Sequence, residues 1–296
     1  MAYTNTDTNM TTSSALSAGM QTYYNRELLR TFEPNLVHLQ FGDEHRMPPH
    51  SGLVMNMRKL IPLETNTKAL SEGDPGESVM LAETEVTVQL QQYGEYARCT
   101  DKLDLTHLDM DIMRRTKLFG DAGARSIDAV VREELAKCAN MIYAGGKASR
   151  AELTAADKLT SRELRKAVKT LKKNHAQTFG GYFVAIIGPD TMYDLQEDEA
   201  FVKVSQYQDK ENIYTGEVGR LFGVRLVETT EAKIFEGAGA DGADVASVIV
   251  LGQYAYGVTS LKGAKPRVIV KPAGSAGTAD PLDQISTVGW KMDGFG

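Results

Sequence analysis

The chain has 296 residues, of which 42% are hydrophobic and 24% charged, and its formal net charge at pH 7 is −6. This composition is that of a soluble protein with one large core or two smaller ones, and its acidic balance argues against a general nucleic-acid binder of the basic kind. No apolar run reaches the length of a membrane span, and the N-terminus lacks the order of a signal peptide. Two cysteines make neither a disulfide framework nor a metal cluster, so we expect synthesis in a reducing cytoplasm.

The first 20 residues are almost all Thr, Asn, Ser, Ala and Asp. They carry too few apolar side chains to offset the entropy lost on ordering, so we expect this arm to be disordered in the isolated chain. Apolar and aromatic residues follow from position 21. Among them Tyr24, Leu28 and Leu29 are candidates to anchor the arm on another surface.

Two alternating segments, 52–61 and 83–93, predict an antiparallel pair of strands. The connection between them, residues 62–81, is long, polar and interrupted by glycine and proline. A two-stranded ribbon on its own is marginal in water. We therefore expect this projecting hairpin to need a partner surface, for which another copy of the chain is the simplest source.

Residues 106–143 carry apolar side chains at steps of three or four, which predicts one long helix. Thr106 begins a sequence that resembles a capping box, and glycines at 145–146 supply a left-handed stop. Such a helix would be about 50 Å long and would cross the whole subunit. Gly120 and Gly123 lower its intrinsic stability, so a kink or break at that point stays open.

A compact mixed unit is predicted after this helix. Thr160 and Glu163 form a second capping box before a short amphipathic helix, which is expected to end near residues 180–181. A proline-initiated helical turn follows at 188–190. Strands are predicted in this unit and in the C-terminal part at 182–187, 224–227, 246–251, 267–270 and 285–292.

Gly237, Gly239 and Gly242 match the spacing G-x-G-x-x-G of dinucleotide-binding proteins. The phosphate site of that motif needs the N-terminus of a helix directly after the glycines. The residues that follow here, 245–251, are typical of a strand instead. A flexible surface loop is therefore the favoured interpretation, and we expect no cofactor.

Three histidines, His38, His45 and His50, lie close in sequence to Asp43 and Glu44 and supply candidate metal ligands. Their spacing fits no helical pair and no known short ligand motif. We favour a solvated loop and expect no metal site.

The remaining charged and nucleophilic patterns indicate no catalysis. The basic residues of the short helix suit either a phosphate contact or an ordinary solvent face, and the solvent face is favoured. No pair of carboxylates is recognisably buried, no serine has the G-x-S-x-G setting, and no cysteine is paired with a histidine in a nucleophile motif. We therefore expect no enzyme and no catalytic residue. The basic residues are Arg162, Arg165, Lys166, Lys169, Lys172 and Lys173.

The order of these elements resembles that of the major capsid proteins of tailed bacteriophages with the Hong Kong 97-like fold, and most closely the N-four-type phage major capsid family. The resemblance spans nearly the whole chain, and its motifs, although short, occur in a specific order. They are Tyr23-Tyr24, Glu33-Pro34-Asn35-Leu36-Val37-His38, Gln92-Tyr93-Gly94-Glu95-Tyr96, Ala279-Asp280-Pro281-Leu282 and Val288-Gly289-Trp290-Lys291.

The resemblance implies an α+β fold in five parts. Residues 1–38 would be the N-terminal arm, and 39–105 the extended loop hairpin with a strand of the peripheral domain. Residues 106–148 would hold the spine helix of the peripheral domain, and 149–251 the axial domain. The C-terminal strands, 252–296, would return to the peripheral domain.

The resemblance also implies that copies of the chain form hexamers and pentamers of an icosahedral shell around double-stranded DNA, without sequence-specific DNA binding. Scaffolding and portal proteins are expected partners, decoration proteins are left open, and no membrane is involved. Lys59 and Lys68 are loop lysines, but no carboxylate is recognisable as the promoter of an isopeptide bond, so we expect no cross-link. Candidate inter-subunit contacts are Tyr23, Tyr24, Leu28, Arg58, Lys68, Glu72, Glu83 and Glu85.

Two alternatives remain open. A protein nanocompartment of the encapsulin type would share the fold and enclose an enzyme instead of a genome. A nucleotide-binding enzyme would use the glycine loop at Gly237 to hold phosphate.

Overall fold

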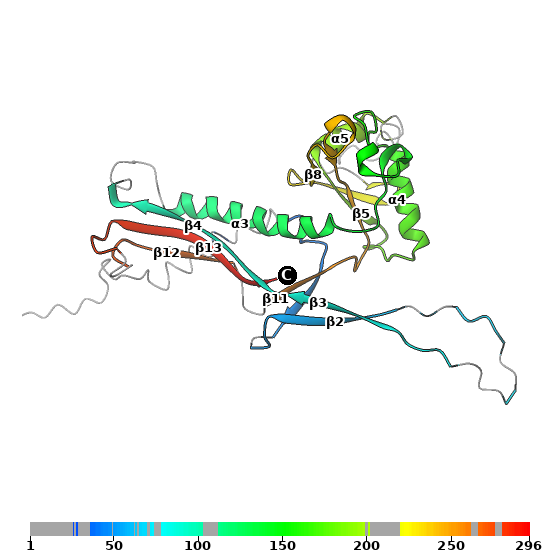
Figure 1. Cartoon of the computed structure of the whole chain (residues 1–296), viewed down its shortest axis with the longest axis horizontal. Coiled ribbons are helices and arrows are strands. Elements are labelled where there is room, and N and C mark those ends of the chain that lie inside the picture. The colour runs from blue at the N-terminus through cyan, green and yellow to red at the C-terminus, as the bar shows by residue number, and fades with distance from the viewer. Residues whose placement is uncertain are drawn as a thin grey trace, which may run out of the picture.

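A computed structural model of the full chain shows an elongated molecule with three parts (Figure 1). A long helix lies along a sheet, a compact α/β unit sits at one end of this helix, and a two-stranded ribbon projects away from both. In the part of the chain that the structure describes, no helix is long and apolar enough to cross a membrane. The described residues are 26, 28, 36–48, 50–61, 63, 65–69, 72–73, 78–102, 112–198, 201, 220–261, 266–275 and 280–296.

The long helix, α3, runs from Ile112 to Leu135. Its 24 residues span about 36 Å, which is shorter than the sequence predicts. Gly120 and Gly123 lie inside it without a break. The N-terminal part of the predicted helix, with Thr106, lies outside the described residues.

The predicted C-terminal end of this helix is wrong. The chain forms turns and irregular structure after Leu135, and the glycines at 145–146 have positive φ in a separate 3₁₀ turn, η2 (Ala144–Gly146). The apolar periodicity continues past Leu135, but Met141 and Ile142 are each 42% exposed. Because most helical stability in proteins comes from burying an apolar face, the helix ends where that face no longer has a surface to cover.

The sheet beneath α3 is organised around its longest strand, β13. Strands β4, β11 and β12 pair with it antiparallel, and β1 pairs with β11 in parallel. Alternate residues of β13, including Val288, Trp290 and Met292, are buried. Trp290 and Met292 pack in one cluster with Ile127 of α3, so the main core of this part lies between helix and sheet. The strands are β1 (Asp43–Met47), β4 (Gln91–Thr100), β11 (Gly257–Leu261), β12 (Arg267–Lys271) and β13 (Ile285–Phe295).

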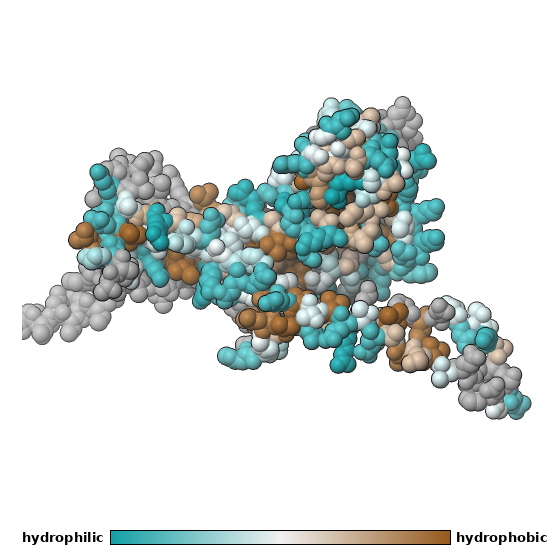
Figure 2. Space-filling view, in the orientation of Figure 1, coloured by the Kyte–Doolittle hydropathy of each residue, from teal (hydrophilic) through white to brown (hydrophobic). Residues whose placement is uncertain are grey.

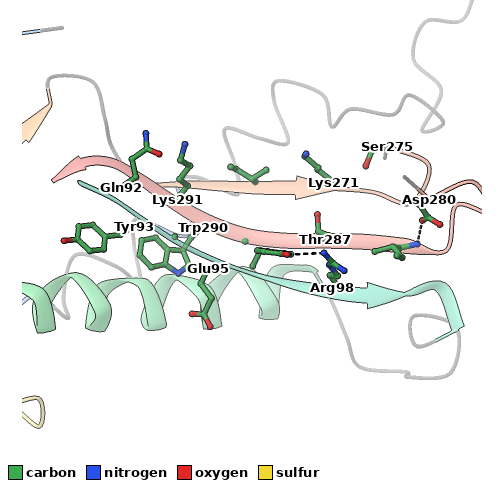
Figure 3. A pocket seen from close by; sticks show the side chains of 15 residues that line it. Gln92, Tyr93, Glu95, Arg98, Lys271, Ser275, Asp280, Thr287, Trp290 and Lys291 are labelled. Carbon is green, nitrogen blue, oxygen red and sulfur yellow. Dashed lines mark hydrogen bonds between the residues drawn. The ribbon is translucent and has the colours of Figure 1, made fainter. Parts of the chain in front are cut away.

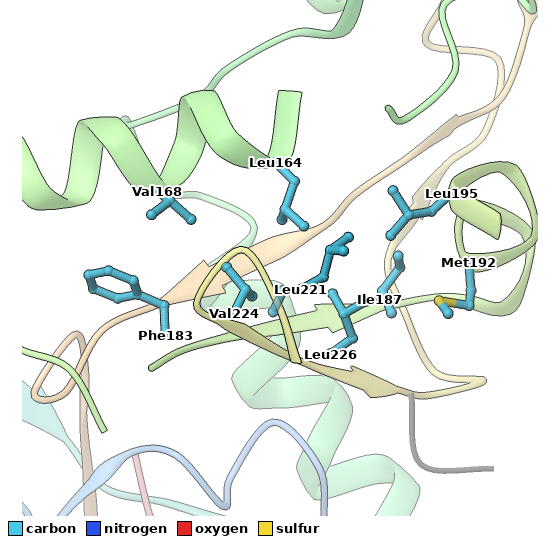
Figure 4. Packing of buried hydrophobic residues seen from close by; sticks show 10 residues of the cluster. Leu164, Val168, Phe183, Ile187, Met192, Leu195, Leu221, Val224 and Leu226 are labelled. Carbon is cyan, nitrogen blue, oxygen red and sulfur yellow. The ribbon is translucent and has the colours of Figure 1, made fainter. Parts of the chain in front are cut away.

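The α/β unit has a four-stranded sheet of order β10-β5-β7-β6 with β5 and β7 parallel at its centre. Every residue of β5 is buried. Helices α4 and α5 pack their apolar residues, including Leu164 and Leu195, onto this sheet (Figure 4). The elements are α4 (Ser161–Lys173), β5 (Phe183–Ile187), α5 (Pro189–Gln196), β6 (Arg220–Leu221), β7 (Val224–Glu228) and β10 (Ile249–Leu251).

Helix α4 begins where the capping-box pattern predicts, but a different residue caps it. The side chain of Thr160 makes no capping hydrogen bond. The backbone N–H of Ser161 instead donates to Oδ2 of Asp198, at 2.7 Å, after the chain has passed through β5 and α5. The helix ends at Lys173, well before residues 180–181, and its C-cap is Asn174.

Smaller elements complete the unit. The strand predicted at 246–251 is two strands, because β9 turns away from the main sheet to pair antiparallel with β8. Short 3₁₀ turns lie before and between them. These elements are η3 (Arg150–Glu152), β8 (Ile234–Phe235), η4 (Ala240–Gly242) and β9 (Val245–Ala246).

Candidate assembly surfaces

The projecting ribbon consists of β2 (Val54–Leu60) and β3 (Glu83–Gln89). The two strands pair antiparallel over their whole length, from Val54 opposite Gln89 to Leu60 opposite Glu83, which confirms the predicted hairpin. Directly opposite residues share a face. One face therefore carries two neighbouring apolar pairs, whereas the other carries Arg58 opposite Glu85 between pairs of polar or mixed character. The apolar pairs are Met55 with Val88 and Met57 with Val86.

The charged face of the ribbon brings three predicted contact residues together. Arg58 lies directly opposite Glu85 in the strand register, and its Nη1 atom is 3.8 Å from Oε2 of Glu83. The side chain of Arg58 is 78% exposed. Because exposed ion pairs contribute little to stability, this cluster adds little to the subunit itself and presents a charge pattern to the surroundings.

The ribbon also exposes large apolar side chains beyond its paired region. Met80 is 90% and Leu81 73% exposed, and both belong to the segment that leads into β3. Figure 2 shows hydrophobic residues along this projection, far from either core. Several large apolar side chains exposed along one projection are typical of a protein interaction site. The other exposed apolar residues beyond the paired region are Ile61, Leu63 and Val79.

The remaining predicted contact residues are placed differently. Lys68 and Glu72 are exposed in the connection between β2 and β3. Tyr23 and Tyr24 lie outside the described residues. Leu28 has no solvent exposure and packs in the same cluster as Ile127 and Phe295. Its side chain therefore belongs to the core of its own subunit, and this burial leaves it no surface for contact with a neighbour.

A groove of about 650 Å³ runs along β4, β13 and β12 (Figure 3). Its lining includes Tyr96 and Ile269, which are exposed, with the backbone of Gly289 between their strands. Arg98 donates a hydrogen bond from Nη2 to the hydroxyl of Tyr96 at 3.2 Å. Asp280 accepts the backbone N–H of Ile285 at 2.6 Å. These polar groups bond to each other or to the backbone of the same subunit.

The three histidines that were weighed as candidate metal ligands are placed in different surroundings. Among the described residues, no three His, Cys, Asp or Glu side chains lie close enough to hold a metal ion. His45 lies 3.4 Å from Asp43 at a half-exposed position, whereas His38 is fully buried. The partner of His38 is Asp128 of α3, with 2.6 Å between Nδ1 and Oδ2. The two residues are 90 positions apart in the sequence, which gave no signal for this contact.

The glycine loop is a turn between two short antiparallel strands. Gly237 precedes the three-residue turn η4, and β9 follows. A Cβ atom on Gly239 would lie 2.8 Å from the carbonyl oxygen of Leu153 and 2.9 Å from that of Ala243. The glycine at this position therefore permits close backbone packing, and the helix N-terminus that a phosphate cradle requires is replaced by a strand.

Solved structures of similar architecture are capsids of phages. The capsid of Ralstonia phage GP4 matches with a TM-score of 0.65 at 14% identity, over 100% of this chain and 92% of that chain. The capsid of cyanophage P-SCSP1u matches with a TM-score of 0.64 at 15% identity, over 88% of this chain and 84% of that chain. The capsid of cyanophage Pam1 matches with a TM-score of 0.62 at 14% identity, over 100% of this chain and 93% of that chain. A long helix on a sheet, an α/β unit and a projecting ribbon give this chain the Hong Kong 97-like fold that these capsid proteins share.

The sequence comparison identifies the family. Residues 83–295 match the family described as phage capsid protein, so the chain belongs to that family. Its place is the capsid of the virion, and its family is a structural one. No curated protein gives a significant match.

Proposed function

We propose that copies of this chain associate head to tail into hexamers and pentamers, and that these form the icosahedral shell that encloses the double-stranded DNA of a tailed phage. The observation that carries the proposal is the projection built on this ribbon, on which large apolar side chains, Met80 and Leu81 among them, are exposed in the single subunit. A ribbon that contacts a different surface of the next copy makes a heterologous contact, and heterologous contacts close into rings.

Within this assembly, the ribbon residues Arg58, Glu83 and Glu85 and the connection residues Lys68 and Glu72 contact a neighbouring subunit. All five are exposed. The apolar side chains at the same projection supply the affinity, since their burial removes hydrocarbon from water. The charges on the ribbon face that carries Arg58 and Glu85 select the partner and the register, because like charges brought opposite each other disfavour wrong pairings.

The shell takes no cofactor, catalyses no reaction and forms no covalent cross-link between subunits. Scaffolding and portal proteins are its assembly partners in the host cytoplasm. The acidic net charge of −6 suits a container whose wall does not grip packaged DNA.

The test is the size of the purified full-length chain, measured by light scattering on a sizing column with electron micrographs of the peak. Rings, tubes or closed shells support the proposal. A chain that stays monomeric or dimeric at high concentration, with crowding agents and with co-expressed scaffold, contradicts it. Particles filled with one foreign protein would favour the nanocompartment alternative, which the exposed ribbon fits equally well.

A further inference from the structure

Within the part of the chain that the structure describes, two separate sets of side-chain contacts join the α/β unit to the part of the molecule built on α3. The first is a wedge, defined as residues 36–41, which lies between the two cores. Leu36 and Leu39 pack against the cluster of α3 and its sheet. Val37 and Phe41 pack against the cluster on β5 and β10 of the α/β unit. The wedge therefore contributes apolar side chains to both bodies at once.

Polar contacts fix the wedge to α3. Oδ1 of Asp128 accepts the backbone N–H of His38 at 2.7 Å and that of Leu39 at 3.3 Å, while Oδ2 binds the ring of His38. The hydroxyl of Tyr256, a residue that packs in both clusters, donates to the carbonyl oxygen of His38. Both His38 and Asp128 are fully buried, so opening this attachment would leave buried polar groups without partners, which is costly.

The second attachment is ionic and faces solvent. We define the clasp as Arg132, Glu133, Glu231 and Lys233. Nη1 of Arg132 donates to the carbonyl oxygen of Glu231 at 2.8 Å, and Nη2 is 3.0 Å from Oε1 of Glu133. Nζ of Lys233 donates to the same Oε1 at 2.8 Å. The clasp therefore ties the last turn of α3 to the segment between β7 and β8.

The two attachments differ in strength. The clasp side chains are 17% to 44% exposed, so water and ions reach them. An ion pair at such a position contributes up to about 1 kcal/mol, whereas breaking a buried pair costs about 3 to 5 kcal/mol. The clasp is therefore the attachment that opens first, while the wedge holds.

The geometry makes opening of the clasp consequential. Asp128 and Arg132 are four residues apart and share one face of α3, so the two attachments lie about 6 Å apart along the helix. Because the clasp lies so close to the wedge, a small displacement at the clasp corresponds to a larger displacement at the far side of the α/β unit.

We propose that the clasp sets the orientation of the α/β unit relative to α3, with the wedge as the pivot about which the unit turns when the clasp opens. The charge state supports this role. The hydrogen bond from Lys233, together with that from Arg132, lowers the pKa of Glu133 below its ordinary value against the opposing effect of burial. The facing groups on both elements are the cations Lys233 and Arg132 and the carboxylate of Glu231. The proposal concerns the single subunit and does not depend on assembly.

The test measures the orientation directly in the full-length chain. Spin labels are placed at Leu118→Cys on α3 and Lys169→Cys on α4, both exposed, with the exposed Cys138 replaced by serine. Labelled chain is diluted into a large excess of unlabelled chain, so that only distances within one subunit contribute. Pulsed electron paramagnetic resonance then gives the distribution of distances between helix and α/β unit.

Lys233→Gln and Glu133→Gln each open the clasp, and Glu134→Gln is the matched control. Glu134 is the next residue on α3 and forms an exposed ion pair with Lys137, at 2.6 Å, that touches only the helix end. Each clasp variant is expected to raise the fraction of chains outside the wild-type distance peak about threefold, the size of effect of a partly exposed ion pair. The control should match the wild type. Equal distributions in all four proteins would overturn the proposal.

Salt gives an independent check. At about 1 M salt the screening length falls to about 3 Å, so the wild-type distribution should broaden towards that of Lys233→Gln. The variant itself should change little. If salt broadens Lys233→Gln as much as the wild type, the orientation is controlled elsewhere and the proposal is wrong.

Discussion

Nδ1 of His38 lies 2.6 Å from Oδ2 of Asp128, and neither side chain has any exposure to solvent. The other oxygen of this carboxylate accepts two backbone N–H groups of the same turn. A single acidic residue in the middle of α3 thereby holds the segment that leads into β1 and the ribbon.

We predict that Asp128→Ala lowers the free energy of unfolding by about 3 to 5 kcal/mol, because it leaves a buried imidazole and two buried N–H groups without an acceptor. Urea denaturation of the unassembled chain measures the loss. Asp121→Ala is the matched control on the same helix, since Asp121 pairs with Arg125 in an exposed i, i+4 contact. It should cost less than about 1 kcal/mol. Similar losses in the two variants would show that the buried pair has no special role.

We predict that ionisation of Tyr256 lowers the free energy of unfolding at alkaline pH. Burial, with a smaller contribution from the charge of Asp128, raises the pKa of the Tyr256 hydroxyl well above its ordinary value. In the unfolded chain tyrosine ionises near pH 10. Its contribution to stability is therefore complete below about pH 10 and is lost as the pH rises further, by up to about 1.4 kcal/mol per pH unit.

The Tyr256→Phe variant tests this origin. It lacks the hydrogen bond to His38 and should be about 1 kcal/mol less stable at neutral pH, yet its stability should fall less steeply above pH 10. Denaturation at a series of alkaline pH values gives both slopes. Parallel slopes in variant and wild type would assign the alkaline loss to other groups.

We predict that a side chain at position 289, in the central strand β13, clashes with the neighbouring strand. A Cβ atom there would lie 2.6 Å from the carbonyl oxygen of Glu95 and 2.7 Å from Cβ of Tyr96, on the neighbouring strand β4. Gly289→Ala should lower the free energy of unfolding by about 1 to 3 kcal/mol through overpacking. Lys291→Ala, two residues along on the same face of β13, changes an ion pair with Asp293 and should cost less than about 1 kcal/mol. A tolerated alanine at position 289 would contradict the close approach.

The elements with a strong local pattern were predictable from the sequence. The ribbon follows from the alternation of Met55 and Met57 with polar neighbours, and the start of α4 from the residues around Thr160. The end of α3 was not predictable, since the apolar period runs on past Leu135 and only the lack of a covering surface stops the helix. Period alone does not say whether a partner surface exists.

Contacts between distant parts of the chain were not predictable either, because a local pattern does not show which other segment will pack against it. His38 and Asp128 each look like ordinary surface residues until the fold brings them together, and Asp198 caps α4 from beyond α5. Leu28 shows the converse, because an apolar residue near a polar arm suits an external contact as well as the internal one it makes. The division into arm, loop, spine, axial unit and C-terminal strands stays a prediction.

The ribbon gives the prediction that separates folding from assembly. Met80 and Leu81 are 90% and 73% exposed, so replacing both with serine should leave the unfolding of the unassembled chain unchanged within about 0.5 kcal/mol. If a neighbouring copy covers them, the same change removes apolar surface from the interface. The concentration at which particles form should then rise about tenfold or more, as for a loss of about 1.4 kcal/mol.

Light scattering against concentration measures this threshold, with Leu118→Ser as control because Leu118 is similarly exposed, at 66%, but lies on α3. A threshold that rises only for the ribbon variant places the neighbour on the ribbon. If both variants raise the threshold equally, the loss of any large exposed apolar residue would explain the effect, and the result would not identify the ribbon as the contact. If neither does, the apolar residues of the projection lie outside the contact, and its charged face, with Arg58 and Glu85, would have to carry the association alone.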